Sequence, residues 1–220
     1  MRESIEDSYR HRGMRRALLG KLREKGIHDE RVLHAIGQIP RHIFFDAAFL
    51  EHAYQDKAFP IGEGQTISQP YTVARQTELL DVGPGMKTLE VGTGSGYQAW
   101  VLALLGAKVF SVERIPALYQ KALHLFRRLP YAVQLHLGDG TLGWKSRAPF
   151  ERILVTAGAP FVPDALLEQL SLGGKLVIPV GDDQQQRMIR LTKLAGNEIR
   201  KEEFEVYRFV PLKGKLGWNE

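Results

Sequence analysis

The spacing of apolar residues changes along the chain, and each change predicts a different kind of element. In the N-terminal part, apolar residues recur at partly helical intervals among many charged ones. This spacing predicts helices over residues 4–25 and 29–40 and a short turn over residues 41–48. Asp29 is a candidate N-cap for the second helix, and Pro40 is a candidate end. The N-terminal part is therefore expected to consist of amphipathic helices.

Further along, short runs of β-type residues alternate with helical runs. Strands are expected over residues 88–91, 108–112, 133–137, 152–156 and 175–180, with helices over 72–80, 97–105, 117–129 and 163–170. Such alternation is typical of parallel βαβ units, so the predicted fold class is α/β, a doubly wound Rossmann-like sheet. Two last strands, 188–194 and 204–210, are separated by a turn signal at residues 195–197. They are expected to form an antiparallel pair that closes one edge of the sheet.

The length of 220 residues fits one domain with a sizeable core. We divide it into an N-terminal helical part (1–50), a loop and helix (51–85), a βα core (86–185) and C-terminal strands with a tail (186–220). The sequence contains no low-complexity segment and no obvious internal repeat.

The net charge of +5 raises the possibility of a nucleic-acid-binding protein, but its distribution argues against one. The net charge is +4 over residues 1–43, −2 over residues 44–186 and +3 over residues 187–220. The surplus lies at the two ends of the chain, which favours solvated helix faces and a basic tail. We therefore predict no nucleic-acid partner.

Several other classes of function are excluded by composition. The chain has no cysteine, which rules out disulfides, thiolate nucleophiles and cysteine-based zinc sites, and which fits a reducing compartment. Its start lacks the apolar stretch of a secretory signal, and its most apolar run, residues 99–107, is shorter than the roughly 18 residues of a membrane helix. The 7 histidines include no pair three or four residues apart. We therefore expect a cytoplasmic protein with no membrane partner and no metal.

The strongest local signal is the run Leu-Glu-Val-Gly-Thr-Gly-Ser-Gly-Tyr at residues 89–97, where a strand leads through alternating glycines into a helix. Such glycines let the backbone turn sharply and approach a ligand at the helix N-terminus. A dinucleotide-binding fingerprint would have Gly or Ala where Tyr97 stands. The carboxylate of Glu90 would repel a diphosphate but attract a cationic amine or sulfonium. S-adenosylmethionine carries both groups.

Acidic residues also end the next two predicted strands. Glu113 is placed to accept hydrogen bonds from ribose hydroxyls, and Asp139 with Gly140 is placed to contact an adenine edge. The alternative is that Glu113 and Asp139 only cap the helices that follow them. Acids at three consecutive strand ends favour the cofactor interpretation.

A polar loop upstream of the glycines carries uncharged hydrogen-bonding groups at Gln65, Thr66 and Ser68. Its form, Gly-x-Gly-Gln-Thr-Ile-Ser before Glu-Val-Gly-Thr-Gly-Ser-Gly-Tyr, resembles that of the bacterial protein-L-isoaspartate O-methyltransferases. The resemblance extends from about residue 26 to residue 212, through Ser-Val-Glu-Arg at residues 111–114 and Phe-Val-Pro-Leu at residues 209–212. The glycine loop alone would indicate only some methyltransferase.

The resemblance implies a protein carboxyl O-methyltransferase. It would transfer a methyl group from S-adenosyl-L-methionine to the α-carboxylate of L-isoaspartyl residues, with S-adenosyl-L-homocysteine as co-product, and so begin repair through a succinimide. Its partners would be isoaspartyl-containing proteins and peptides, and the chain would act as a monomer.

The resemblance also assigns site residues. Ser68 is the expected catalytic residue, which orients the acceptor carboxylate, and Thr66 and Val210 are expected to join it in substrate binding. The residues expected to bind the cofactor are Gln65, Thr66, Ile67, Glu90, Gly92, Thr93, Gly94, Glu113, Asp139 and Gly140.

Alternatives remain open at this point. Ser68 stands just before Pro70, where a serine is a good helix N-cap. The chain could also be a methyltransferase of the same architecture that acts on a small molecule or RNA, or a nonenzymatic basic binding module. A nicotinamide-dependent oxidoreductase is disfavoured by Tyr97 and Glu90.

Overall fold

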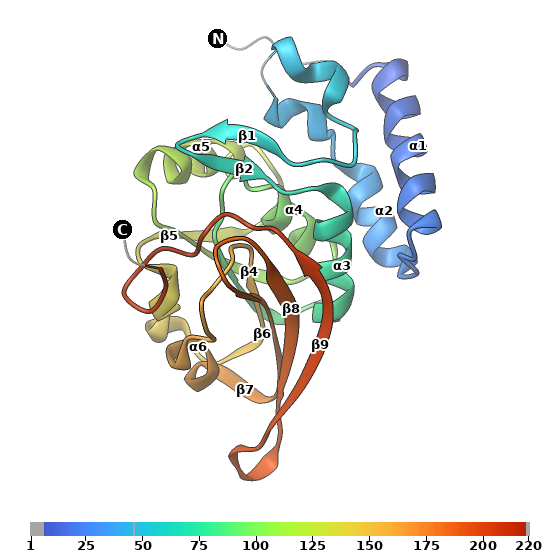
Figure 1. Cartoon of the computed structure of the whole chain (residues 1–220). Coiled ribbons are helices and arrows are strands. Elements are labelled where there is room, and N and C mark those ends of the chain that lie inside the picture. Colours follow the sequence, from blue (N-terminus) through green and yellow to red (C-terminus); the bar gives the residue numbers. More distant parts are fainter. Residues whose placement is uncertain (1–6, 46, 219–220) are drawn as a thin grey trace.

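The computed structural model describes residues 7–45 and 47–218, and its centre is a seven-stranded sheet (Figure 1). The sheet order is β5-β4-β3-β6-β7-β8-β9. Its strands are β3 (Lys87–Val91), β4 (Lys108–Glu113), β5 (Val133–Leu137), β6 (Phe150–Val155), β7 (Leu170–Gly181), β8 (Gln186–Lys193) and β9 (Ile199–Tyr207). Neighbours from β5 to β7 run parallel, whereas β8 runs antiparallel to both β7 and β9. The predicted doubly wound sheet and its antiparallel edge pair are confirmed.

The order in which successive strands are added to the sheet reverses between β3 and β6, which makes this place a topological switch point. From β3 the chain adds β4 and β5 on one side, then returns to place β6 on the other side of β3. Ligands of open α/β sheets bind outside the carboxyl ends of the strands at such a switch point. Because residues 92–96 directly follow β3, the topology places the glycine loop there.

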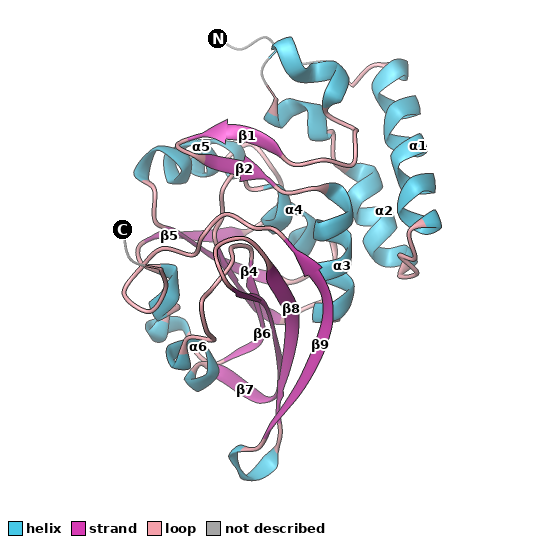
Figure 2. Ribbon diagram, viewed as in Figure 1, coloured by secondary structure: helices cyan, strands magenta, loops and turns pink. Residues whose placement is uncertain are grey.

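Helices cover the sheet, as Figure 2 shows. They are α1 (Tyr9–Glu24), α2 (Glu30–Gln38), α3 (Pro70–Leu80), α4 (Tyr97–Leu104), α5 (Pro116–Phe126) and α6 (Asp164–Glu168), with 3₁₀ turns η1 (Arg41–Phe44), η2 (Ala47–His52), η3 (Gly140–Leu142), η4 (Lys145–Arg147) and η5 (Ala195–Asn197). Two buried apolar clusters form. On β6, Leu154 belongs to the first cluster, while Ile153 and Val155 belong to the second. Since alternate strand residues point to opposite faces, the clusters lie on the two sides of the sheet.

The N-terminal helices pack against the first cluster through α2 and α3. Leu18 and Leu22 of α1 and Leu33 and Ile36 of α2 are buried there. Ser8 caps α1, since its hydroxyl accepts a hydrogen bond from the His11 amide. The predicted helices are confirmed in kind, although residues 4–6 of the first lie outside the described part of the chain.

The structure corrects several details of this prediction. The loop upstream of α3 contains an antiparallel ribbon, β1 (Phe59–Gly62) and β2 (Gln65–Ile67), which the sequence analysis did not predict. The helix expected over residues 163–170 is only five residues long, because β7 begins at Leu170 instead of Lys175. The last strand, expected over residues 204–210, begins at Ile199 and ends at Tyr207. Among the described residues, none of the helices combines the length and apolar character needed to cross a bilayer.

Candidate functional site

A cavity of about 250 Å³ opens at the carboxyl ends of β3 and β4. It is bounded by the ribbon β1–β2, the glycine loop, the ends of β4 and β6, and the segment that follows β9. The predicted site residues that line this pocket are Gln65, Thr66, Ile67, Ser68, Gly92, Thr93, Gly94, Glu113, Gly140 and Val210. The structure therefore brings together most of the predicted site, from segments far apart in the sequence. The carboxyl groups of Glu90 and Asp139 are the exceptions.

The glycine loop passes so close to β6 that Gly92 has no room for a side chain. Gly92 has φ +96°, and a Cβ there would lie 2.5 Å from Oγ1 of Thr156. The Thr156 hydroxyl in turn donates to the Gly92 carbonyl at 2.7 Å. The loop is therefore a rigid main-chain cradle on the pocket wall, as a ligand that approaches the backbone requires.

Glu113 ends β4 beside this loop. One carboxylate oxygen accepts from the Gly94 amide and the other from the Ile115 amide, each at 2.8 Å. Each oxygen has a second lone pair, which leaves capacity for two hydroxyl donors from a ligand. Glu113 lines the pocket although the side chain is buried. The hydrogen bond from the amide of Ile115, the N-cap residue of α5, and a cofactor role are thus compatible, because the two use different lone pairs.

Glu90 lies under the glycine loop and does not line the pocket. The Ser111 hydroxyl donates to its Oε2, and Ser111 also shares a hydrogen bond of 2.6 Å with Thr93. The chain of contacts from Glu90 through Ser111 ends on Thr93, which does line the pocket. Burial raises the pKa of Glu90 to about 8. Glu90 therefore supports the loop from below, mainly as a neutral acid at pH 7.

This buried acid predicts a pH-dependent stability. In the folded state Glu90 keeps its proton up to about pH 8, whereas the unfolded chain releases it near 4.5. Since the folded state binds the extra proton between these values, the free energy of unfolding should fall as the pH rises from 5 to 8. Glu90→Gln should remove this component, worth about 2–4 kcal/mol, and raise stability at pH 8. Urea unfolding at several pH values measures the effect.

The matched control for that experiment is Glu168→Gln, because Glu168 is an exposed acid on α6. It should leave the pH dependence as in the wild type. Equal slopes for the wild type and Glu90→Gln would contradict the assigned protonation state.

Asp139 holds the C-terminal tail. Its Oδ1 accepts from the Thr141 amide at 2.9 Å and caps η3, while Oδ2 accepts from the Lys215 amide at 2.7 Å. At the far end of the tail, the Trp218 indole donates to the Gly158 carbonyl at 2.9 Å. The capping alternative thus describes the Asp139 side chain in this structure, and Gly140, next to it, is the residue that reaches the pocket.

Ser68 follows β2 and lies on the pocket wall, just before α3. It does not cap that helix: the N-cap position is Gln69, without a side-chain capping bond. Instead, Oδ1 of Asp56 accepts from the Tyr71 amide at 2.8 Å, and Oδ2 accepts from the Gln69 side chain at 3.0 Å. Because a distant carboxylate caps α3, the Ser68 hydroxyl is not used for capping. The N-cap alternative for Ser68 is therefore wrong.

Val210 lines the pocket, but not as part of the last strand. Its carbonyl accepts from the Gly158 amide at 2.8 Å, and the Leu212 amide donates back to the Gly158 carbonyl at 2.7 Å. The segment after β9 therefore pairs with the chain after β6, over the carboxyl end of the sheet.

Sequence reasoning missed several lining residues. They are Glu63, Val73, Val91, Ser95, Tyr97, Gln98, Val112, Arg114, Ile115, Leu118, Thr156, Ala157, Pro211, Leu212 and Lys213. Thr156 was within reach of prediction, because it directly follows the fourth parallel strand, where site residues of such folds gather. Lys213 carried no such signal, since only the tertiary path of the tail brings it to the pocket.

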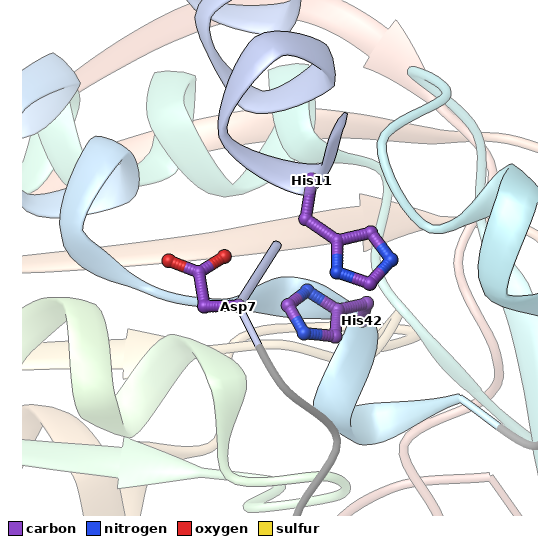
Figure 3. A group of neighbouring side chains, drawn as sticks. All are labelled: Asp7, His11 and His42. Atoms are coloured by element: carbon purple, nitrogen blue, oxygen red, sulfur yellow. The ribbon is translucent and has the colours of Figure 1, made fainter. Parts of the chain in front are cut away.

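A second polar cluster lies away from the pocket, where Asp7, His11 and His42 offer nitrogen and oxygen atoms within 4.8 Å of one another (Figure 3). Sequence spacing could not reveal it, because the tertiary structure brings η1 to the start of α1. The two imidazole rings stack at 3.9 Å and 25°, so their in-plane lone pairs do not converge on one point. Arg15 donates to both oxygens of Asp7 and holds the pKa of that carboxyl below its usual range. The geometry fits a salt-bridged anchor for α1 better than a metal site.

The pocket fits S-adenosylmethionine in its chemistry. A main-chain cradle at Gly92 excludes side chains, and Glu113 offers acceptors for sugar hydroxyls. Apolar walls at Val73, Leu118 and Val112 suit an adenine ring. Ser68 and Val210 line the same cavity.

Comparison with known proteins gives a consistent result. The family model described as protein-L-isoaspartate(D-aspartate) O-methyltransferase matches residues 13–217. A protein-L-isoaspartate O-methyltransferase of Cytophaga hutchinsonii is 60% identical over 215 residues, which cover 98% of this chain and 97% of the relative. One of Christiangramia forsetii is 56% identical over 209 residues, covering 94% of this chain and 98% of the relative.

Solved structures agree. A protein-L-isoaspartate O-methyltransferase superimposes with a TM-score of 0.83 at 29% identity, covering 92% of this chain and 67% of the other. A putative protein-L-isoaspartate O-methyltransferase of Plasmodium falciparum, in complex with S-adenosyl-L-homocysteine, gives a TM-score of 0.78 at 27% identity, covering 90% and 97%.

Proposed function

This chain belongs to the protein-L-isoaspartate(D-aspartate) O-methyltransferase family, and we propose that it methylates the α-carboxylate of L-isoaspartyl residues in damaged proteins and peptides. S-adenosylmethionine supplies the methyl group as an electrophilic sulfonium substituent and leaves as S-adenosylhomocysteine. The amide nitrogen on the isoaspartyl side-chain carbonyl then attacks the methyl ester and expels methanol to form a succinimide, and water opens this ring partly to normal aspartate. The observation that carries the proposal is that one cavity is lined by the glycine cradle, by Glu113 and by Ser68, whose hydroxyl does not cap α3.

The acceptor needs no general base. A carboxyl group with a reference pKa of about 3.5–4 is ionised at neutral pH, so its oxygen is already the nucleophile. The contribution of the protein is then mainly to position this oxygen in line with the methyl–sulfur bond at roughly 3–3.5 Å and to exclude water.

Ser68 is suited to orient the acceptor carboxylate. A hydroxyl donates one hydrogen bond, which fixes the direction of the carboxylate without neutralising it. An arginine at this place would form two charge-assisted hydrogen bonds and lower the nucleophilicity of the oxygen. Thr66 and Ile67, on β2 beside it, hold the loop over both reactants.

The segment at Val210 is proposed to contact the peptide that carries the isoaspartyl residue. Its main chain already pairs with Gly158 on one side and lies at the rim of the same cavity. Recognition through main-chain contacts would accept isoaspartyl residues in many sequence contexts. We also propose that the enzyme acts as a cytoplasmic monomer without nucleic-acid or membrane partners. The cysteine-free composition supports the reducing compartment, and the location of the surplus charge at the two ends of the chain argues against a nucleic-acid partner.

The experiment that tests this function uses two peptides that differ only in an Asp or isoAsp linkage. With radiolabelled S-adenosylmethionine, we expect base-labile label on the isoaspartyl peptide alone. Equal labelling of both peptides, or of neither, would overturn the proposal. A transfer-RNA substrate serves as the control for a methyltransferase of the same fold with another acceptor.

A further inference from the structure

A buried arginine stands directly behind Ser68. Arg41, the first residue of η1, is 1% exposed. Its Nε donates to the Ala53 carbonyl at 2.9 Å, and its Nη2 donates to the Ser68 carbonyl at 3.0 Å. The guanidinium carbon also lies 4.7 Å from the centre of the Tyr97 ring and 5.5 Å from that of Phe45. One side chain thus joins the N-terminal part, the Ser68 loop and the start of α4.

The burial of this charge is unusual. Among the described residues, no carboxylate forms an ion pair with Arg41, and the polar group left to its Nη1 is the buried hydroxyl of Tyr97, which favours the charged guanidinium. The nearby acid Asp56 pairs with Lys25 instead, at 2.6 Å. A buried cation without a counterion is costly, and carbonyl dipoles with aromatic faces offset only part of that cost. An apolar residue would serve packing alone better, so packing does not explain the arginine.

The shape of the guanidinium suggests what it does. Its donors form a rigid planar fork, so contacts from Nε and Nη2 fix the carbonyls of Ala53 and Ser68 relative to each other. Asp56 holds the other side of the same turn through Gln69 and Tyr71. The main chain at Ser68 is therefore held from both sides, which fixes its Cα–Cβ bond and so limits its hydroxyl to the few positions that the staggered rotamers allow.

We propose that Arg41 is a positioning residue for the methyl acceptor: it fixes the main chain at Ser68, and so the Cα–Cβ bond that carries the hydroxyl, without touching either reactant. This inference rests on the proposed function. It assigns the N-terminal part a share in the acceptor side of the pocket. The cradle at Gly92 and Glu113, on the cofactor side, receives no hydrogen bond from Arg41.

A double-mutant cycle with Arg41→Lys and Ser68→Ala tests the proposal. Lysine keeps the positive charge but has no planar fork, so it cannot bind the carbonyls of Ala53 and Ser68 in a fixed geometry. The main chain that carries the Ser68 hydroxyl then loses this support. Arg41→Lys should lower kcat for the isoaspartyl peptide about tenfold to a hundredfold, the scale of a misplaced catalytic contact. The dissociation constant for S-adenosylhomocysteine, measured by calorimetry, should stay within about threefold. Ser68→Ala should then lower kcat by a much smaller factor in the Arg41→Lys background than in the wild type.

The matched control is Arg152→Lys. Arg152 is also buried, and its guanidinium donates to the carbonyls of Asp81 and Glu151, each at 2.9 Å, but it lies near the amino ends of the strands. It should lower the unfolding midpoint without changing kcat at a temperature where both variants are folded. If Arg41→Lys does not fold, Arg41→Gln is the second variant.

Several outcomes would overturn the proposal: an unchanged kcat in Arg41→Lys, effects of Arg41→Lys and Ser68→Ala that multiply, an equal loss of kcat in Arg152→Lys, or failure of both Arg41 variants to fold. If the wild type does not label the isoaspartyl peptide, the proposed function itself has failed. If the wild type labels it and Arg41→Lys matches that rate, only the positioning role has failed.

Discussion

Ser68→Ala is expected to lower kcat for an isoaspartyl peptide about a hundredfold, because it removes the hydrogen-bond donor that orients the acceptor carboxylate. The helix that follows should be unaffected, since Asp56 and not Ser68 caps α3. Steady-state kinetics with saturating S-adenosylmethionine measure kcat, and calorimetry measures the affinity for S-adenosylhomocysteine. That affinity should stay within about threefold of the wild type, because a substitution that removes no contact with the cofactor changes the free energy by only about 0.5 kcal/mol.

Ser146→Ala provides the control for a lost serine hydroxyl, because Ser146 is exposed in η4 and does not line the pocket. It should leave kcat unchanged. If Ser68→Ala instead abolishes S-adenosylhomocysteine binding while kcat at saturation is preserved, Ser68 belongs to the cofactor side and its assignment to the acceptor is wrong.

Glu113→Ala should have the opposite effect to Ser68→Ala: it should weaken cofactor binding and largely preserve kcat. It removes the acceptors expected to bind the ribose hydroxyls, and it also leaves the amides of Gly94 and Ile115 without their partner. Two charge-assisted hydrogen bonds are worth about 1.5–3 kcal/mol each, so the dissociation constant of the cofactor should rise about a hundredfold or more. Turnover at saturating S-adenosylmethionine should remain closer to that of the wild type. Calorimetry and initial rates over a range of cofactor concentrations separate the two effects.

Glu113→Gln is the matched variant, because it keeps the size of the side chain and one carbonyl oxygen. It should fall between the wild type and Glu113→Ala in cofactor affinity. A large loss of kcat at saturation, with cofactor affinity intact, would show that Glu113 acts on the acceptor instead.

The sheet was predictable because its information is local. Runs such as residues 108–112 are short, β-rich and followed by helical periodicity, and βαβ handedness leaves few ways to assemble them. The same logic located the glycine cradle and Glu113, since carboxyl ends of parallel strands meet at one edge. A polar residue at a strand end, such as Glu113, is therefore predictable from the sequence as a pocket-lining residue.

What escaped prediction depends on contacts between distant segments. A serine two residues before Pro70 has the pattern of an N-cap, and nothing local reveals that Asp56 takes that role. Glu90 stands at a strand end like Glu113, yet its side chain points into the buried layer beneath the loop. Only the packing of neighbouring strands decides between these two directions.

The anchoring of residues 214–218 has a consequence for limited proteolysis. Residues 210–213 line the pocket, and Asp139 and Gly158 hold the segment that follows them through hydrogen bonds from Lys215 and Trp218. A ligand that binds only the assembled pocket stabilises this anchored segment by mass action. We therefore expect S-adenosylhomocysteine to slow tryptic cleavage after Lys213 and Lys215.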